Sequence, residues 1–352
     1  MGNLNNLLEI SSYYLYLEYT PSYPRTVHST AVSGSLYNMD SVDRIILERL
    51  KTNCRIGLQV LATKTKVSAN EVKKRIDLLL NTGVIQNFTT LLSPQMTNEE
   101  QVITILDFET TPDEKSVLKI LNDNSAVWKV HRSLEDKYVV VGIYFDHEEL
   151  TNLTLLYRSL EGIREVEMHS RFLRYWGGKV DLTENHKQTL RCLLVDARMS
   201  VADIAKQTGL PSNVVNETIN EMRESEAVLF TTNTSDYKMG SKTEVLAKIQ
   251  WNVGITNHEQ VLKWLQDEFP SAYIREFVSV TEPTLFFKFT VNHVQEVEFV
   301  MQKAHDSGLI SIIESLILFP GTIFPDPRQR RLSELLTETG FSGENQSDHS
   351  FR

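Results

Sequence analysis

The chain has 352 residues, of which 41% are hydrophobic and 23% charged, a composition typical of a globular protein with two or three domains. No stretch approaches the roughly 18 consecutive apolar residues of a membrane span, the N-terminus lacks the pattern of a secretory signal, and two cysteines cannot build a metal cluster or a disulfide framework. The net charge of −10 argues against a nucleic-acid-binding protein, unless the charge is unevenly distributed.

The first organised sequence begins at Met39. Residues 1–38 are rich in Tyr and Ser without clear periodicity, and we expect a tail there or a start codon assigned too early. Apolar residues then recur at helical spacing over 45–50 and 72–80, with a short helix expected between them. Residues 84–90 predict a strand. The order of three helices and a strand is that of a winged helix-turn-helix, which we assign to residues 39–97.

The third of these helices has clear start and stop signals. Ser68 precedes Glu71 by three residues, which is typical of a capping box at a helix N-terminus. Gly83 follows the helical pattern, as expected for the residue after a helix end. In a helix-turn-helix this helix is the one that enters the major groove of DNA.

The next segment, residues 98–178, alternates strands and helices in the order β-α-β-β-α-β. This is the ferredoxin-like split βαβ arrangement. The expected strands cover 101–108, 127–132, 138–145 and 163–172, and the expected helices cover 112–122 and 147–160.

The two segments are repeated along the chain. An offset of 143 places Leu61-Ala62 on Ile204-Ala205, which indicates a tandem duplication of the whole unit. We therefore predict an α+β fold with a second helix-turn-helix at 179–240 and a second ferredoxin-like module at 241–322. Residues 323–352 predict a short amphipathic helix over 332–336 and a disordered tail.

These modules resemble the leucine-responsive/AsnC (Lrp/AsnC) family of transcription regulators of bacteria and archaea. The resemblance is carried by DRIILERL at 43–50, GLQVLA at 57–62, VSANEVKKRI at 67–76 and LNTGVI at 80–85. It implies a cytoplasmic, nucleoid-associated regulator that binds double-stranded DNA and has no enzymatic activity or cofactor. It also implies ferredoxin-like sheets that pair, here within one chain, and a homodimer or larger assembly of such chains.

The charge is indeed unevenly distributed between the two helix-turn-helix segments. Residues 40–95 hold nine basic and five acidic residues, a balance of +4, whereas residues 181–232 hold five basic and eight acidic residues, a balance of −3. Basic residues of the first copy are lost in the second, where the corresponding residues are Gln207 for Lys64, Gly209 for Lys66, Asn216 for Lys73, Glu217 for Lys74 and Thr218 for Arg75. Since phosphate contacts supply most of the affinity for DNA, we expect only the first copy to bind it.

Within that first copy we assign a set of candidate DNA-contacting residues. Basic residues before and within the turn would contact phosphates, residues at the start of the third helix would contact phosphates or base edges, and the following basic residues would face the groove or its edge. The set is Arg55, Lys64, Lys66, Ser68, Ala69, Asn70, Lys73, Lys74 and Arg75. The alternative interpretation is that these charges form a solvated helix face.

The resemblance also implies a small-effector site near the turn between the second and third strands of the ferredoxin-like module. In this chain the corresponding candidates are Glu135, Asp136 and Tyr138. The glycine of the family pattern is missing from this turn in both copies, which makes a solvated hairpin the simpler interpretation.

Two other functions remain open. Siroheme decarboxylases resemble the same architecture, and some are tandem fusions, but their His-Asn-Tyr-x-Arg run is absent where this chain has Val130-His131-Arg132. Alternatively, the acidic second helix-turn-helix docks a protein partner in place of DNA. No phosphate-binding loop, dinucleotide fingerprint or metal-ligand spacing is present in the sequence.

Overall fold

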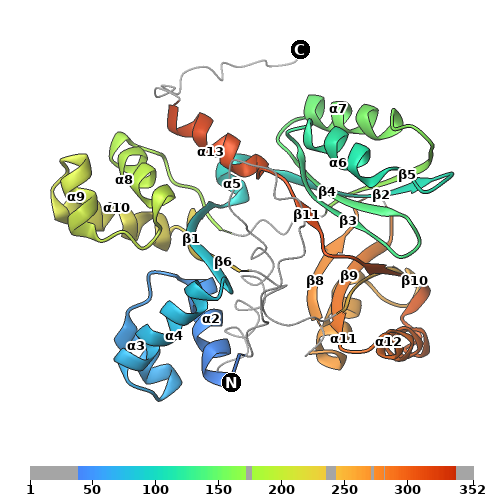
Figure 1. The fold of residues 1–352 in the computed structure, drawn as a ribbon, viewed down its shortest axis with the longest axis horizontal. Coiled ribbons are helices and arrows are strands. Elements are labelled where there is room, and N and C mark those ends of the chain that lie inside the picture. The colour runs from blue at the N-terminus through green and yellow to red at the C-terminus, as the bar shows by residue number, and fades with distance from the viewer. Residues whose placement is uncertain (1–38, 172–176, 235–242, 271–272, 281, 338–352) are drawn as a thin grey trace, which may run out of the picture.

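The computed structural model describes residues 39–171, 177–234, 243–270, 273–280 and 282–337. Both predicted helix-turn-helix modules are present, each with three helices and a strand (Figure 1). The first module consists of α2 (Ser41–Thr52), α3 (Leu58–Thr65), α4 (Ala69–Asn81) and β1 (Ile85–Leu92). The second consists of α8 (Glu184–Val195), α9 (Val201–Thr208), α10 (Ser212–Glu224) and β6 (Val228–Thr234).

Both ferredoxin-like modules are confirmed as well, with all their strand pairs antiparallel. The first contains β2 (Glu100–Phe108), α6 (Glu114–Asn122), β3 (Val127–Arg132), β4 (Tyr138–Tyr144), α7 (His147–Arg158) and β5 (Ile163–Ser170). The second contains β7 (Thr243–Trp251), α11 (His258–Glu268), β8 (Tyr273–Val278), β9 (Thr284–Val291), α12 (Gln295–Asp306) and β10 (Ile310–Leu318). The sheet orders are β11-β3-β4-β2-β5 and β10-β7-β9-β8.

The two sheets pack face to face within the one chain. Figure 1 shows α6 and α7 outside one sheet and α11 and α12 outside the other. Successive residues of a strand point to opposite faces, so Val102 packs under the helices of its own module whereas Ile103 packs toward the other sheet. Leu246 and Phe286 meet it from the second module. The chain is therefore a pseudo-dimer of ferredoxin-like modules.

The strands of the helix-turn-helix modules pair with each other. β1 and β6 form a two-stranded antiparallel sheet in which Phe88 lies opposite Thr232 and Thr90 lies opposite Phe230. From the sequence, each strand is expected within its own winged module and has no predicted partner. A lone strand exposes unpaired backbone groups, and the tandem copy satisfies them.

The segment after the second ferredoxin-like module returns to the first half of the chain. The predicted C-terminal helix is present and begins earlier than expected, as α13 (Pro327–Thr337), preceded by β11 (Thr322–Ile323). β11 pairs with β3, and Leu332 and Leu336 of α13 enter the core of the second helix-turn-helix module. A four-residue helix, α5 (Pro94–Thr97), lies beside α13 (Figure 1). None of the described helices is long and apolar enough to cross a membrane.

One ion pair between the two sheets predicts how stability depends on pH. The Glu167 carboxylate accepts a hydrogen bond from His169 Nε2 at 2.8 Å and another from Lys248 of the opposite sheet. These partners lower the pKa of Glu167 from 4.5 to about 2. Because the folded pKa is depressed, the stabilisation is complete above pH 4.5 and is lost as pH falls from 4.5 toward 2.

We expect Glu167→Gln to lower the free energy of unfolding by about 2 kcal/mol at pH 7 and to flatten its decline below pH 4.5. Urea unfolding at several pH values measures both effects. The control is Glu165→Gln, an exposed carboxylate on the same strand, which should change little. Equal pH profiles for the wild type and Glu167→Gln would contradict the prediction.

Candidate nucleic-acid interface

The turn between α3 and α4 contains the residue that caps α4, the third helix of the module. Ser68 caps α4, its hydroxyl accepting a hydrogen bond from the Glu71 N–H at 3.1 Å. Lys66 ends α3 in the left-handed region, with φ of +59°. Glycine adopts that region at lower cost than lysine, and the second module has Gly209 there, with φ of +76°. The first module therefore keeps a cation in the turn in spite of the backbone cost.

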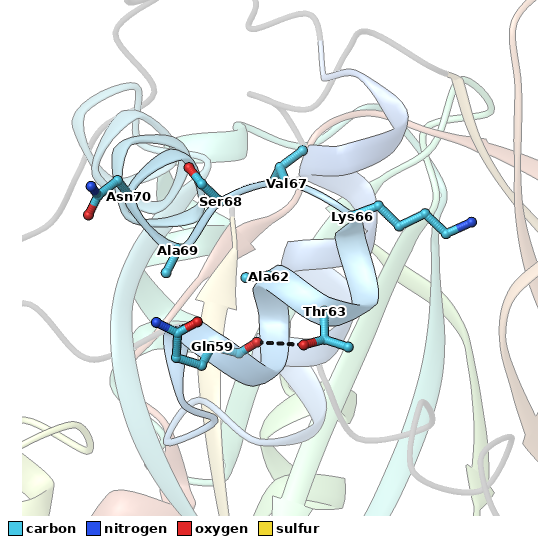
Figure 2. A pocket seen from close by; sticks show the side chains of 8 residues that line it. All are labelled: Gln59, Ala62, Thr63, Lys66, Val67, Ser68, Ala69 and Asn70. Atoms are coloured by element: carbon cyan, nitrogen blue, oxygen red, sulfur yellow. Dashed lines mark hydrogen bonds between the residues drawn. The ribbon is translucent and has the colours of Figure 1, made fainter.

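A groove of about 580 Å³ lies between α3 and the start of α4 (Figure 2). Its lining is small or polar and comprises Gln59, Ala62, Thr63, Lys66, Val67, Ser68, Ala69 and Asn70. Figure 2 shows Lys66 and Asn70 at opposite ends of the groove, with Gln59 and Thr63 along α3. The groove therefore presents amide and hydroxyl groups beside a cation.

Four of the predicted basic residues lie at the surface around this groove or along the first two turns of α4. Lys64, Lys66, Lys73 and Lys74 are all exposed. The Lys73 ammonium lies 3.9 Å from the Asp77 carboxylate, and both side chains are more than half exposed, so this pair is weak. The structure places these lysines where a polyanion can reach them.

Arg55 is engaged elsewhere, and we correct its predicted role as a phosphate contact. Its guanidinium donates hydrogen bonds to the carbonyl oxygens of Ala197, at 2.6 Å, and Met199, at 3.0 Å. It also lies over the ring of Phe230, 5.7 Å from the centroid. All three partners belong to the second helix-turn-helix module, so Arg55 joins the two modules.

Arg75 also differs from its predicted place at the edge of the DNA groove. It donates to Asp40 at 2.7 Å, to Asp43 at 2.9 Å and to Glu71 at 3.0 Å. These bonds raise the pKa of Arg75, and the Asp43 N–H and Arg75 together lower the pKa of Asp40. Arg75 therefore fixes α4 against the N-terminus of α2, whose capping box is formed by Asp40 and Asp43.

Gln59 and Thr63 were missed by the sequence analysis. They lie four residues apart on α3, and therefore on the same helix face, beside Ala69 and Asn70 of α4. That i, i+4 spacing of polar residues is visible in the sequence. It becomes meaningful only when α4 closes the other side of the groove.

The second module presents a different surface at the corresponding positions. Asn216 and Glu217 are exposed where the first module has Lys73 and Lys74, and Thr218 is buried where it has Arg75. α10 begins after Pro211, which supplies no side-chain cap, in contrast to Ser68. The asymmetry of charge predicted from the sequence is thus exposed on the surface.

The predicted effector residues do not form one site. Tyr138 is 1% exposed and its ring packs edge-on against Phe108, 5.6 Å away, so we correct it to a core residue of the ferredoxin-like module. Asp136, in the hairpin turn, accepts hydrogen bonds from Thr111 and Arg132, which lower its pKa. Glu135 lies exposed beside it. The effector site remains a prediction for Glu135 and Asp136.

Comparison with known proteins agrees with this assignment of modules. Residues 39–80 match the AsnC-type helix-turn-helix domain, and residues 182–228 match a winged helix-turn-helix DNA-binding domain. The HTH-type transcriptional regulator LysM of Saccharolobus solfataricus is 28% identical over 130 residues, covering 37% of this chain and 87% of that protein. The HTH-type transcriptional regulator LrpA of Pyrococcus horikoshii is 27% identical over 117 residues, covering 33% and 82%.

Each relative thus aligns over most of its own length with about a third of this chain. The chain therefore contains an AsnC-type helix-turn-helix domain and a second winged helix-turn-helix domain in tandem, and it is similar to these regulators over about a third of its length. Among solved structures, the siroheme decarboxylase NirDL is similar over 84% of this chain and 98% of its own, with a TM-score of 0.57 and 12% identity. At that identity the likeness shows a shared fold, and a fold does not define an activity.

The contacts of Arg75 predict a selective effect on the first helix-turn-helix module. Arg75→Met should lower its free energy of unfolding by about 2 kcal/mol, because the carboxylate of Asp43, which is 2% exposed, loses a charged donor. Lys74→Met, on the exposed face of the same helix, should change it by less than about 0.5 kcal/mol. Amide hydrogen exchange of α4 measures both variants. Equal effects would show that Arg75 does not fix the helix.

Proposed function

We propose that this protein is a transcriptional regulator that binds double-stranded DNA through its first helix-turn-helix module. The observation that carries the proposal is the groove at the start of α4, bordered by exposed lysines, in a segment that matches the AsnC-type domain. The relatives named as transcriptional regulators support it. The net charge of −10 does not oppose it, since phosphate attraction depends on the charge of the contacting surface.

We propose a role for each remaining candidate residue. Lys64 and Lys66 contact phosphates beside the turn, and Lys73 and Lys74 extend that contact along α4. Ser68, Ala69 and Asn70 of the recognition helix approach bases or phosphates at the groove, together with the newly identified Gln59 and Thr63. Arg55 and Arg75 are left out of the contact set because other parts of the chain hold them.

One chain then carries one DNA-reading module in a pseudo-dimeric frame. A two-fold symmetric DNA site needs two such modules, since half-site spacing mirrors protein symmetry. We therefore propose that the regulator acts on the nucleoid as a homodimer or larger assembly of these chains.

We propose that the chain acts by binding DNA and not as a siroheme decarboxylase. The likeness to NirDL is one of fold. His131, which stands where the decarboxylase motif was sought, is 4% exposed, with Nδ1 3.1 Å from the Phe319 carbonyl oxygen and Gly321 packed against its ring. Copurification of a tetrapyrrole, seen in the visible absorption spectrum, would instead favour the enzyme.

A salt titration of DNA binding tests the proposal. The intact chain should bind duplex genomic fragments with an affinity that falls steeply as salt rises. Lys73→Ala/Lys74→Ala should bind more weakly, with the slope of log K against log[salt] shallower by about 2, since each lost phosphate contact removes about 0.9. Fluorescence anisotropy across salt concentrations measures both quantities.

The matched control is Lys206→Ala, which removes an exposed lysine from α9 of the second module and should leave the slope unchanged. If the intact chain fails to bind duplex DNA even at low salt, the proposed function is wrong. If Lys206→Ala alone lowers the slope, the second module and not the first contacts DNA.

A further inference from the structure

We propose that the second helix-turn-helix module is a bracket that holds the first one in a fixed orientation, with Arg55 and Arg198 as its positioning residues. The bracket concerns the arrangement of the two modules. Its consequence for DNA reading rests on the proposed function. It assigns a role to a module in which the counterparts of Lys64, Lys66, Lys73 and Lys74 are uncharged or acidic.

Arg55 makes the first contact by which the second module holds the first one. A guanidinium that donates to two carbonyl oxygens and stacks on a ring is held in one geometry, in contrast to a surface arginine. The two carbonyls, of Ala197 and Met199, lie in the turn between α8 and α9. Arg55 stands in the corresponding turn between α2 and α3. The contact of Arg55 therefore joins the inter-helix turns of the two modules.

Arg198 makes the second, reciprocal contact between the two modules. Its guanidinium lies over the ring of Phe88, 4.9 Å from the centroid, just as Arg55 lies over Phe230. Arg198 is the repeat counterpart of Arg55 through the offset of 143. Each arginine thus stacks on an aromatic residue of the other module's strand, which makes a pseudo-symmetric pair of cation–π contacts.

Backbone and core contacts surround these two arginines. Cys54, beside Arg55, is buried in the hydrophobic core of the second module, and its N–H donates to the Phe230 carbonyl at 2.8 Å. The Thr231 hydroxyl donates to the Lys51 carbonyl at 2.7 Å, and the Thr90 hydroxyl donates to the Leu193 carbonyl at 3.1 Å. With the β1–β6 ladder, these bonds leave the modules little freedom to rotate against each other.

Helix α13 anchors the second helix-turn-helix module to the frame formed by the two ferredoxin-like modules. Leu332 and Leu336 pack in the core of the second module, and Arg191 donates to the Leu336 carbonyl at 2.6 Å. At the other end of the helix, Arg330 donates to Glu149 of α7 at 2.5 Å and lies over Phe145. The second module therefore has fixed contacts to the frame on one side and to the DNA-reading module on the other.

The experiment compares a positioning variant with a phosphate-contact variant in two measurements. Arg55→Ala and Arg198→Ala should each weaken DNA binding at least fivefold with an unchanged salt slope, because neither residue contacts a phosphate. Lys74→Ala should lower the slope by about 0.9. Arg198→Ala serves as the second variant should Arg55→Ala fail to fold, and thermal melting checks the folded state of both.

The second measurement needs no DNA. Spin labels at Asp77→Cys on α4 and Glu217→Cys on α10, both exposed positions, report the distance between the modules. The native thiols are buried, and burial raises the pKa of Cys54 to about 12, so labelling is directed to the introduced cysteines. The distance distribution should be narrow in the intact chain and in Lys74→Ala, and broader in Arg55→Ala and Arg198→Ala.

Two outcomes would overturn the bracket. One is a salt slope that falls by about 0.9 in Arg55→Ala, which would make Arg55 a phosphate contact. The other is an unchanged distance distribution in both arginine variants. If the intact chain binds no DNA, the proposed function fails while the distance measurement still tests the bracket.

Discussion

The structure depends on surfaces that neither half of the chain can cover alone. Each ferredoxin-like sheet has one face under its helices and a second apolar face, and each helix-turn-helix module ends in a single strand. Exposed apolar faces and unpaired strand edges both favour association. The tandem copy supplies the missing partner in cis, through the contact between the two sheets and through the β1–β6 ladder.

Covalent linkage of the two halves allows the matching surfaces to differ. Late in the repeat the offset becomes 147, which places Phe172 on Phe319. Through this offset, His169 on β5 and Arg171 just after β5 correspond to Leu316 and Leu318 on β10. His169 contacts Ser279 and Phe286 of the other module, whereas its counterpart Leu316 packs against the apolar cluster between the sheets. In a symmetric dimer of identical chains, a substitution at such a position appears on both sides of the interface. Here each side can differ alone, as the charges of the two helix-turn-helix modules also do.

Local periodicity was enough to predict the order of elements, the repeat and the cap at Ser68, because each depends on residues close together in sequence. The destinations of Arg55 and Arg75 could not be predicted in this way. Their hydrogen-bond partners lie up to 144 residues away in sequence, and a basic residue near a turn is equally consistent with DNA contact. Tyr138 was misassigned because strand alternation buries its ring against Phe108, a contact that the sequence of the turn does not indicate. The pairing of β11 with β3, almost 200 residues earlier in the chain, is also a contact between distant segments.

The division between arginine and lysine in the first module follows from their chemistry. A guanidinium is planar and offers several donors in fixed directions, which suits the carbonyl pair at Arg55 and the carboxylates at Arg75. An ammonium on a flexible stem acts as a point charge, which suits phosphates along a groove whose exact geometry varies with sequence. The lysines remain exposed, while Arg75 fixes two helices of the module together and Arg55 joins the module to the second one. The module's balance of +4 therefore includes two arginines that are engaged in contacts within the protein. The four exposed lysines describe the proposed DNA-facing surface better than the count of basic residues does.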